Sequence, residues 1–112
     1  MSAITTHVLD TSRGRPAAGV PITLSRRTDR AWRELGKGLT DADGRAKTLL
    51  EPGEFTPGVY RLVFDTAAYY RMHNLDGFYP EVVVSFIVKE GTGHYHVPLL
   101  LSPYGYSTYR GS

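Results

Sequence analysis

The stretch Tyr60-Arg61-Leu62-Val63-Phe64-Asp65 decides the fold of this chain, because Tyr, Leu and Phe occupy every second position. Alternate side chains of a β-strand point to opposite faces, so this pattern predicts a strand with one buried face. The stretch Val82–Val88 alternates in the same way and predicts a second strand of the same kind. Both segments are typical of a sheet that packs against another layer.

The rest of the chain extends this pattern. Its twelve glycines and seven prolines favour many short strands joined by turns. Further strands are expected at Ile4–Asp10, Val20–Arg27, Trp32–Leu35, Arg45–Leu49, His94–Leu101 and Tyr104–Tyr109. The segment Asp65–Asn74 breaks the period and predicts one short helix, capped by Asp65 or Thr66. Together these elements predict an all-β fold, a β-sandwich, with residues 1–112 forming one domain.

Composition excludes several classes of function. The chain has no cysteine, which excludes disulfides, thiolate metal sites and a cysteine nucleophile. We expect no membrane partner, because no apolar run is long enough to span a bilayer. The first residues lack the features of a secretory signal, so a cytoplasmic location is expected. The net charge of +2 comes from interspersed charges without a nucleic-acid-binding module, which favours a small anionic ligand held by one or two arginines.

The segment His94–Leu101 indicates contact with another subunit. Pro98 cannot donate a backbone hydrogen bond to a neighbouring strand, which is typical of an edge or a bulge. The run Leu99–Leu101 places apolar side chains on both faces of the strand, and only one face can lie in the core of the domain. We therefore expect an identical subunit to cover the other face.

Histidines are the main candidates for chemistry. His94 and His96 lie two positions apart on one predicted strand, so they share a face, whereas His7 lies on a different strand. An imidazole with a pKa of about 6.5 can accept or release a proton at neutral pH, and we expect His96 to do so. Zinc binding by His7, His94 and His96 is a less favoured alternative, because no carboxylate is clearly placed as a fourth ligand. No metal is therefore expected.

The stretch Asp41-Ala-Asp-Gly44 resembles part of a calcium-binding loop. Aligned on Gly44, that loop would place Leu39 and Leu50 at its first and last ligand positions, so the pattern fails. The stretch predicts a tight turn instead, in which Gly44 adopts a positive φ. The turn fixes the position of Arg45, a residue well suited to clamp an anion.

The chain ends in the dense polar stretch His94-Tyr-His-Val-Pro-Leu-Leu-Leu-Ser-Pro-Tyr-Gly-Tyr-Ser-Thr-Tyr-Arg-Gly-Ser112. The spacing of its tyrosines suits a strand that docks on the domain, and Ser112 brings a hydroxyl and the terminal carboxylate to one place. The chain has neither a Gly-x-Ser-x-Gly elbow nor a glycine-rich phosphate loop. These residues favour histidine-assisted attack of water on a small, polar, anionic molecule.

This C-terminal stretch resembles the C-terminus of the 5-hydroxyisourate hydrolases, the transthyretin-related enzymes of urate breakdown. Their hallmark is the ending Tyr109-Arg-Gly-Ser112. The resemblance covers nearly the whole chain. It also includes His7–Asp10 with Gly14 and Pro16-Ala17, Thr40–Arg45, and the stretch from Tyr69-Tyr70 to Phe78–Glu81.

The resemblance implies a transthyretin-like β-sandwich of two four-stranded sheets with one short helix. It also implies a homotetramer of paired dimers, with sites at the dimer–dimer interface and no cofactor. The resemblance leaves His94 outside the site, as a structural or peripheral residue. The site residues that it implies are His7, Arg45, His96, Tyr109, Arg110, Gly111 and Ser112.

The implied reaction opens the six-membered ring of 5-hydroxyisourate at an amide and gives 2-oxo-4-hydroxy-4-carboxy-5-ureidoimidazoline. Arg45 would hold the substrate and the oxyanion, and His7 and His96 would deprotonate water and protonate the leaving nitrogen. Ser112 would orient the water or a histidine, and Tyr109 would line the pocket. The alternative function is a transthyretin-like carrier of small aromatic ligands without catalysis. Transthyretin shares Ser-Pro-Tyr and Tyr-Ser-Thr near its end but continues with a different tail.

Overall fold

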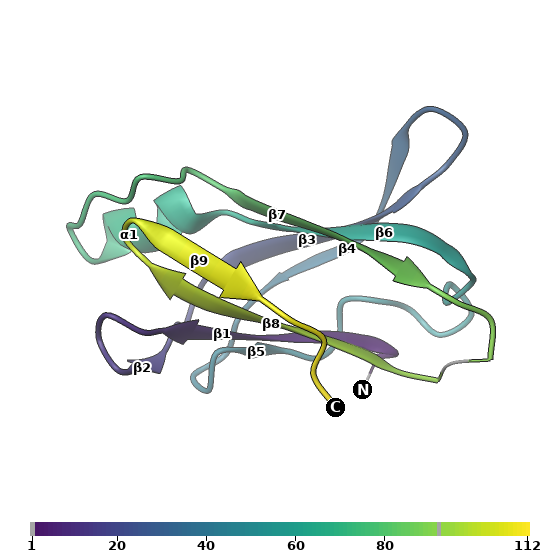
Figure 1. The fold of residues 1–112 in the computed structure, drawn as a ribbon, viewed down its shortest axis with the longest axis horizontal. Helices are drawn as coiled ribbons and strands as arrows, with labels where there is room; N and C mark the ends of the chain where they lie inside the picture. Colours follow the sequence, from purple (N-terminus) through teal and green to yellow (C-terminus); the bar gives the residue numbers. More distant parts are fainter. Residues whose placement is uncertain (1, 92) are drawn as a thin grey trace.

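The computed structural model describes residues 2–91 and 93–112 as two β-sheets packed face to face with one short helix beside them (Figure 1). The first sheet has five strands, in the order β2-β1-β8-β9 with β5 also paired to β1, and the second has the order β4-β3-β6-β7. The predicted all-β sandwich with a short helix is confirmed. The elements are β1 (Ile4–Asp10), β2 (Arg15–Pro16), β3 (Pro21–Arg27), β4 (Trp32–Leu39), β5 (Arg45–Ala46), β6 (Gly58–Phe64), α1 (Thr66–Met72), β7 (Val82–Val88), β8 (Tyr95–Ser102) and β9 (Gly105–Thr108).

Strand β4 continues to Leu39, past its expected end at Leu35. It contains Gly36, and a Cβ atom there would lie 1.8 Å from the backbone oxygen of Leu49. Only glycine therefore lets the segment after β5 pass so close to β4.

Strand β5 is correspondingly shorter than the predicted Arg45–Leu49. It ends at Ala46, and Leu49 and Leu50 then turn inward, where they are 3% and 5% exposed. The short strand β2 forms within the loop that was expected between the first two strands. Because both short strands pair with β1, the first sheet has five strands where four were expected.

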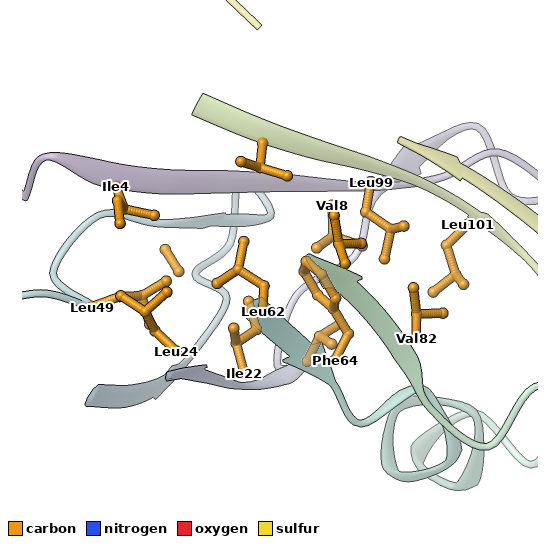
Figure 2. Close-up of a cluster of buried hydrophobic side chains, with 14 of the residues drawn as sticks. Ile4, Val8, Ile22, Leu24, Leu49, Leu62, Phe64, Val82, Leu99 and Leu101 are labelled. Atoms are coloured by element: carbon orange, nitrogen blue, oxygen red, sulfur yellow. The ribbon is translucent and has the colours of Figure 1, made fainter. Parts of the chain in front are cut away.

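The hydrophobic core fills the space between the two sheets (Figure 2). Tyr60, Leu62 and Phe64 have no exposed surface, as their alternation predicted. Leu99 and Leu101 are also buried, whereas Leu100 lies half-buried on the other face of β8. Full burial of one such side chain stabilises a fold by about 1.5–3 kcal/mol, so these strands contribute much of its stability.

Helix α1 begins after Asp65, whose carboxylate accepts a hydrogen bond of 3.0 Å from the backbone nitrogen of Ala68. This selects Asp65 from the two predicted caps. The helix is tied to the end of β1 by Tyr69, whose hydroxyl donates to a carboxylate oxygen of Asp10 at 2.7 Å. Among the described residues, no helix has the length and apolar composition needed to cross a membrane.

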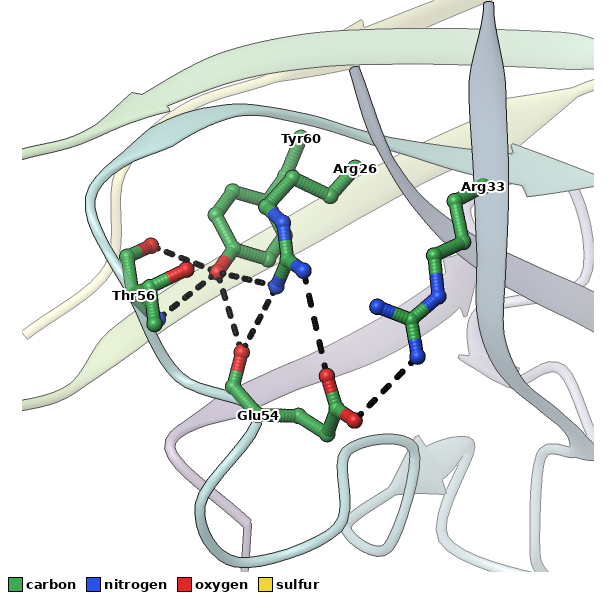
Figure 3. A network of polar contacts seen from close by, with 5 residues as sticks. All are labelled: Arg26, Arg33, Glu54, Thr56 and Tyr60. Carbon is green, nitrogen blue, oxygen red and sulfur yellow. Dashed lines mark hydrogen bonds and ion pairs between the residues drawn. The ribbon is translucent and has the colours of Figure 1, made fainter. Parts of the chain in front are cut away.

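A polar network fixes the connection between β5 and β6 (Figure 3). The Glu54 carboxylate lies 3.8 Å from the guanidinium of Arg26 and 3.4 Å from that of Arg33. The Tyr60 hydroxyl donates to the backbone oxygen of Thr56 at 2.6 Å and accepts from its nitrogen at 3.0 Å. None of the predicted site residues takes part in these contacts, so we assign the network to stability of the fold.

Candidate active site

Strand β1 is the centre of the candidate site, because β8 pairs with it on one side and β5 on the other. The antiparallel pairing with β5 places Arg45 opposite His7. The parallel pairing with β8 places His96 opposite Thr5. Three predicted site residues from distant parts of the sequence are thereby brought onto adjacent strands.

These strands border an open hollow of about 190 Å³. Its lining contains three predicted site residues, Arg45, His96 and Ser112. His7 is not part of the lining, but it lies on β1 opposite Arg45. Larger hollows of about 390 and 360 Å³ lie around the loop that carries Phe55, but neither contains a histidine. The complete lining of the site is Thr5, Thr6, Arg45, Lys47, His94, His96 and Ser112.

The C-terminal segment is held against β8 at Gly111. Its backbone nitrogen donates to the backbone oxygen of His96 at 2.8 Å. A Cβ atom at Gly111 would lie 2.6 Å from Cδ2 of the His96 ring and 3.3 Å from Pro98. Glycine therefore lets the segment pass directly over the imidazole and bring Ser112 to the hollow.

Tyr109 and Arg110 lie elsewhere. Both line a second hollow of about 230 Å³, bordered by Ile87 of β7 and by Tyr95 of β8. The Arg110 guanidinium lies 4.4 Å from the centre of the Tyr95 ring, a cation–π contact that holds it there. Within one chain, the structure does not bring these two predicted substrate-binding residues to the histidines.

The turn before Arg45 is rigidly built, as predicted. A carboxylate oxygen of Asp41 accepts hydrogen bonds from the backbone nitrogens of Asp43 and Arg45, at 2.9 and 3.0 Å. The bond from Arg45 is the main reason that the pKa of Asp41 is lowered. Gly44 has φ 77°, and a Cβ atom there would lie 2.4 Å from the backbone oxygen of Val8. The turn therefore fixes the backbone from which Arg45 projects.

Lys47 also lines the hollow and was missed in the sequence. It lies two positions after Arg45, the spacing that places two side chains on one face of an extended chain. This two-residue spacing is the sequence feature from which Lys47 could have been predicted. The hollow therefore has two cationic side chains that can stabilise a negative charge.

Thr5 is the other residue that the sequence did not reveal. Its hydroxyl lies 2.8 Å from Nδ1 of His96 and 3.1 Å from Nε2 of His94. The two rings are nearly parallel, at 12°, with their centroids 6.5 Å apart. His94, which was expected to be peripheral, thus contributes to the lining of the hollow.

The zinc alternative does not find its ligands in this arrangement. Within residues 2–91 and 93–112, no group of three His, Asp or Glu side chains is placed to hold a metal ion. His94 and His96 instead share the hydroxyl of Thr5.

The pKa of His96 is lowered from its ordinary value of 6.5. Burial is the largest cause, followed by electrostatic repulsion from Arg45, His7 and His94, while a hydrogen bond to the backbone of Thr5 acts in the opposite direction. The imidazole is therefore neutral at pH 7, and a neutral imidazole can accept a proton from water.

The fold and the site define a transthyretin-like β-sandwich with a histidine-rich hollow. A model of the HIUase/Transthyretin family matches residues 4–111, so the chain belongs to this family. The 5-hydroxyisourate hydrolase of Salmonella dublin is 48% identical over 109 residues, which cover 97% of this chain and 80% of that protein.

Two solved structures extend the comparison. Sea bream transthyretin in complex with thyroxine superposes with a TM-score of 0.93 at 36% identity, covering 98% of this chain and 95% of its own. The 5-hydroxyisourate hydrolase of Klebsiella pneumoniae superposes with a TM-score of 0.85 at 33% identity, and the match covers 99% of this chain and 100% of that one. The likeness in fold thus extends both to a 5-hydroxyisourate hydrolase and to a protein that binds thyroxine, so the fold alone does not decide between these two functions.

Proposed function

We propose that this chain hydrolyses 5-hydroxyisourate and opens its six-membered ring to 2-oxo-4-hydroxy-4-carboxy-5-ureidoimidazoline. The observation that carries the proposal is that His96, Arg45 and Ser112 line one hollow. Burial and nearby charge lower the pKa of His96, which favours the neutral imidazole there. A proton acceptor beside a fixed cation is what attack of water on an amide requires. The name of the Salmonella dublin relative, at 48% identity, supports the same reaction.

In the proposed mechanism, His96 accepts a proton from water while the water oxygen bonds to the ring carbonyl carbon. Arg45 stabilises the oxyanion that forms, a contribution of about 3 kcal/mol for a well-placed donor. The amide C–N bond then breaks, and the proton held by the imidazole passes to the leaving nitrogen. His7 lies opposite Arg45 and assists in holding the water or the substrate.

The C-terminal residues divide between two tasks in this proposal. Ser112 lines the hollow and orients the water, and Gly111 allows the close passage over His96. Tyr109 and Arg110 lie in the second hollow, so they reach substrate only if subunits associate there.

We therefore include the expected homotetramer in the proposal. Strands β7 and β9 each form the end of their sheet, and exposed apolar side chains such as Ile87 and Tyr109 lie beside them. Pairing of these edges between two copies would bury the apolar side chains, and a second dimer placed over the open hollow would enclose the substrate. Light scattering coupled to size-exclusion chromatography should give four times the mass of the 12.4 kDa chain. A monomer would contradict this assembly.

The expected cytoplasmic location stays a prediction that cell fractionation would test.

The direct test of function uses urate oxidase to form the unstable substrate in place and follows its ultraviolet decay. We expect this protein to accelerate the decay in proportion to its concentration. A decay rate equal to the spontaneous one would overturn the proposal.

The likeness to the thyroxine complex of sea bream transthyretin favours a second candidate, a carrier of small aromatic ligands. Calorimetric titration with thyroxine separates the two candidates. Saturable thyroxine binding without turnover of 5-hydroxyisourate would support the carrier.

A further inference from the structure

The hydroxyl of Thr5 has an unusual position for a buried threonine of a sheet. Thr5 is 4% exposed, and its oxygen contacts ring nitrogens of both His94 and His96. Its neighbour Thr6, by contrast, donates to the backbone oxygen of Val97, and Thr11 donates to that of Leu101. The hydroxyls of Thr6 and Thr11 therefore satisfy the backbone of β8, whereas that of Thr5 connects two imidazoles.

The number of protons in this contact limits the states of the two rings. A threonine hydroxyl has one proton to donate, and among the described residues the Thr5 hydroxyl has no hydrogen-bond partner other than these two nitrogens. Its proton therefore points to one of them, and its oxygen accepts from the other. If Nδ1 of His96 carries a proton, Nε2 of His94 must lack one, and the reverse also holds. Because a neutral imidazole carries a proton on only one nitrogen, the tautomer of one ring determines the tautomer of the other.

We propose that Thr5 is a positioning residue that couples the two histidines and holds the proton of His96 on Nδ1. The inference deepens the proposed hydrolysis and rests on it, since a base acting through Nε2 needs that atom bare. Among the described residues, Nδ1 of His96 has Thr5 as its partner, whereas no hydrogen bond within the chain engages Nε2. His94 then carries its proton on Nδ1 and accepts from Thr5 through Nε2.

This coupling gives the site a way to move charge away from the reacting atoms. When Nε2 of His96 takes a proton from water, its Nδ1 proton can pass to the Thr5 oxygen while the Thr5 proton passes to Nε2 of His94. His96 is then neutral with a proton on Nε2, ready for the leaving nitrogen, and the positive charge lies on His94. The reverse shift accompanies delivery of that proton, so that Nδ1 of His96 regains its proton as Nε2 loses one, and both histidines return to their neutral resting state.

The first test measures the tautomers directly, in the complete protein labelled with ¹⁵N at its four histidines. Long-range ¹H–¹⁵N spectra distinguish a protonated from a bare ring nitrogen. We expect a protonated Nδ1 and a bare Nε2 for His96, and the same for His94. Finding Nδ1 of His96 and Nε2 of His94 both protonated, or both bare, would overturn the coupling.

Variants separate the hydroxyl from the bulk of the side chain. Thr5→Val keeps the shape and removes the hydroxyl, and it should shift the ring nitrogen signals of both histidines. Thr5→Ser keeps the oxygen and should restore them. Thr11→Val is the control, because Thr11 also donates its hydroxyl to the backbone of β8 but does not line the hollow, and it should leave both tautomers unchanged. Unchanged signals in Thr5→Val would contradict the proposal.

A second variant tests the coupling independently of Thr5→Val, in case that variant fails to fold. His94→Phe changes an exposed side chain and keeps a ring beside His96. It removes the second partner of Thr5, so His96 should become a mixture of tautomers. A His96 that keeps a single tautomer in His94→Phe would contradict the coupling.

Kinetics then connect the coupling to the reaction. We expect Thr5→Val to lower kcat about tenfold, a part of the hundredfold or more that a positioned base contributes, with little change in KM. Thr5→Ser should recover most of the loss. An unchanged kcat in folded Thr5→Val would overturn the positioning role. If the unmodified protein shows no turnover, the proposed function fails, whereas the tautomer measurements still decide the coupling.

Discussion

Two polar clusters lie on strand β1, and they differ in how completely their atoms are satisfied. At the end of the strand, the Asp10 carboxylate accepts hydrogen bonds from the Tyr69 hydroxyl at 2.7 Å and from the Ser12 hydroxyl at 2.8 Å. Nearer its start, Thr5 contacts Nδ1 of His96, and within the described part of the chain no side chain is hydrogen-bonded to Nε2 of that ring, which lies beside an open hollow. A cluster whose atoms are all paired stabilises the fold, whereas one with a free nitrogen facing solvent is available for chemistry.

The pKa values express the same contrast. Burial alone raises the pKa of Asp10, but hydrogen bonds from Tyr69 and Ser12 outweigh it, and the pKa is lowered. Burial, followed by the bond to Asp10, raises the pKa of Tyr69 to about 12. Both groups are thus fixed in one protonation state near neutrality, while His96 remains able to gain and lose a proton.

The largest effect is expected from removing the His96 imidazole, the group that distinguishes the hollow from the Asp10 cluster. His96→Asn should lower kcat by a factor of about 10² to 10⁴, the contribution of a positioned acid–base group, because the base of the proposed mechanism is removed. The urea midpoint of unfolding should change less than for a residue of the core, since His96 is only half-buried. The stopped-flow ultraviolet decay measures the rate. Loss of activity accompanied by unfolding would instead place His96 with the structural cluster.

The next largest effect is expected from Gly111→Ala. The added methyl group would lie 2.6 Å from the His96 ring, so the ring or the C-terminal segment must move. A displacement of about 1 Å from the reacting geometry can cost about a hundredfold in rate. Gly38→Ala is a suitable control, because Gly38, like Gly111, has no positive φ, and a Cβ there would meet only the Leu49 side chain at 3.8 Å, an ordinary contact distance. Equal rates for Gly111→Ala and the unmodified protein would show that the segment does not position the ring.

The Asp10 cluster should respond in the opposite way. Tyr69→Phe leaves a carboxylate oxygen of Asp10, which is 1% exposed, without its partner. The free energy of unfolding should fall by about 1–3 kcal/mol, as measured by urea titration, while kcat of the folded variant stays the same. A fall in kcat without a loss of stability would contradict the division between the two clusters.

The strands could largely be predicted from the sequence, because alternation reports directly which face of a strand is buried. Thr5 could not be assigned, because its contacts depend on a parallel register that joins residues 91 positions apart. The sequence also could not reveal that Arg110 lies over Tyr95 instead of beside the histidines. The importance of Gly111 was implied by a family resemblance, but its reason, the close passage over an imidazole, is visible only in three dimensions.

The smallest expected effect concerns the pH dependence of the reaction. Because the pKa of His96 is lowered below 6.5, kcat/KM should stay constant through neutrality and decline only as the pH falls through this lowered value. Neutral His96 is also the form that the fold favours, so its contribution to stability is present above pH 6.5 and is lost over the same acidic range. Both kcat/KM and the stability of the fold should therefore decrease as the pH falls through this range. If the reacting histidine were fully exposed, kcat/KM would instead decline near pH 6.5.

A variant and a change in salt concentration separate the two causes of the lowered pKa of His96, which are burial and nearby charge. Arg45→Gln removes the largest of the electrostatic effects that lower the pKa of His96 and should move the acidic limb of kcat/KM toward higher pH. Its maximum will also fall if Arg45 binds substrate, so the position of the limb is the informative quantity. High salt should move the limb of the unmodified protein in the same direction, because it screens the charges but leaves burial unchanged. A limb that stays in place under both changes would leave burial alone as the reason that His96 is neutral, and the cations around it would then serve only the substrate.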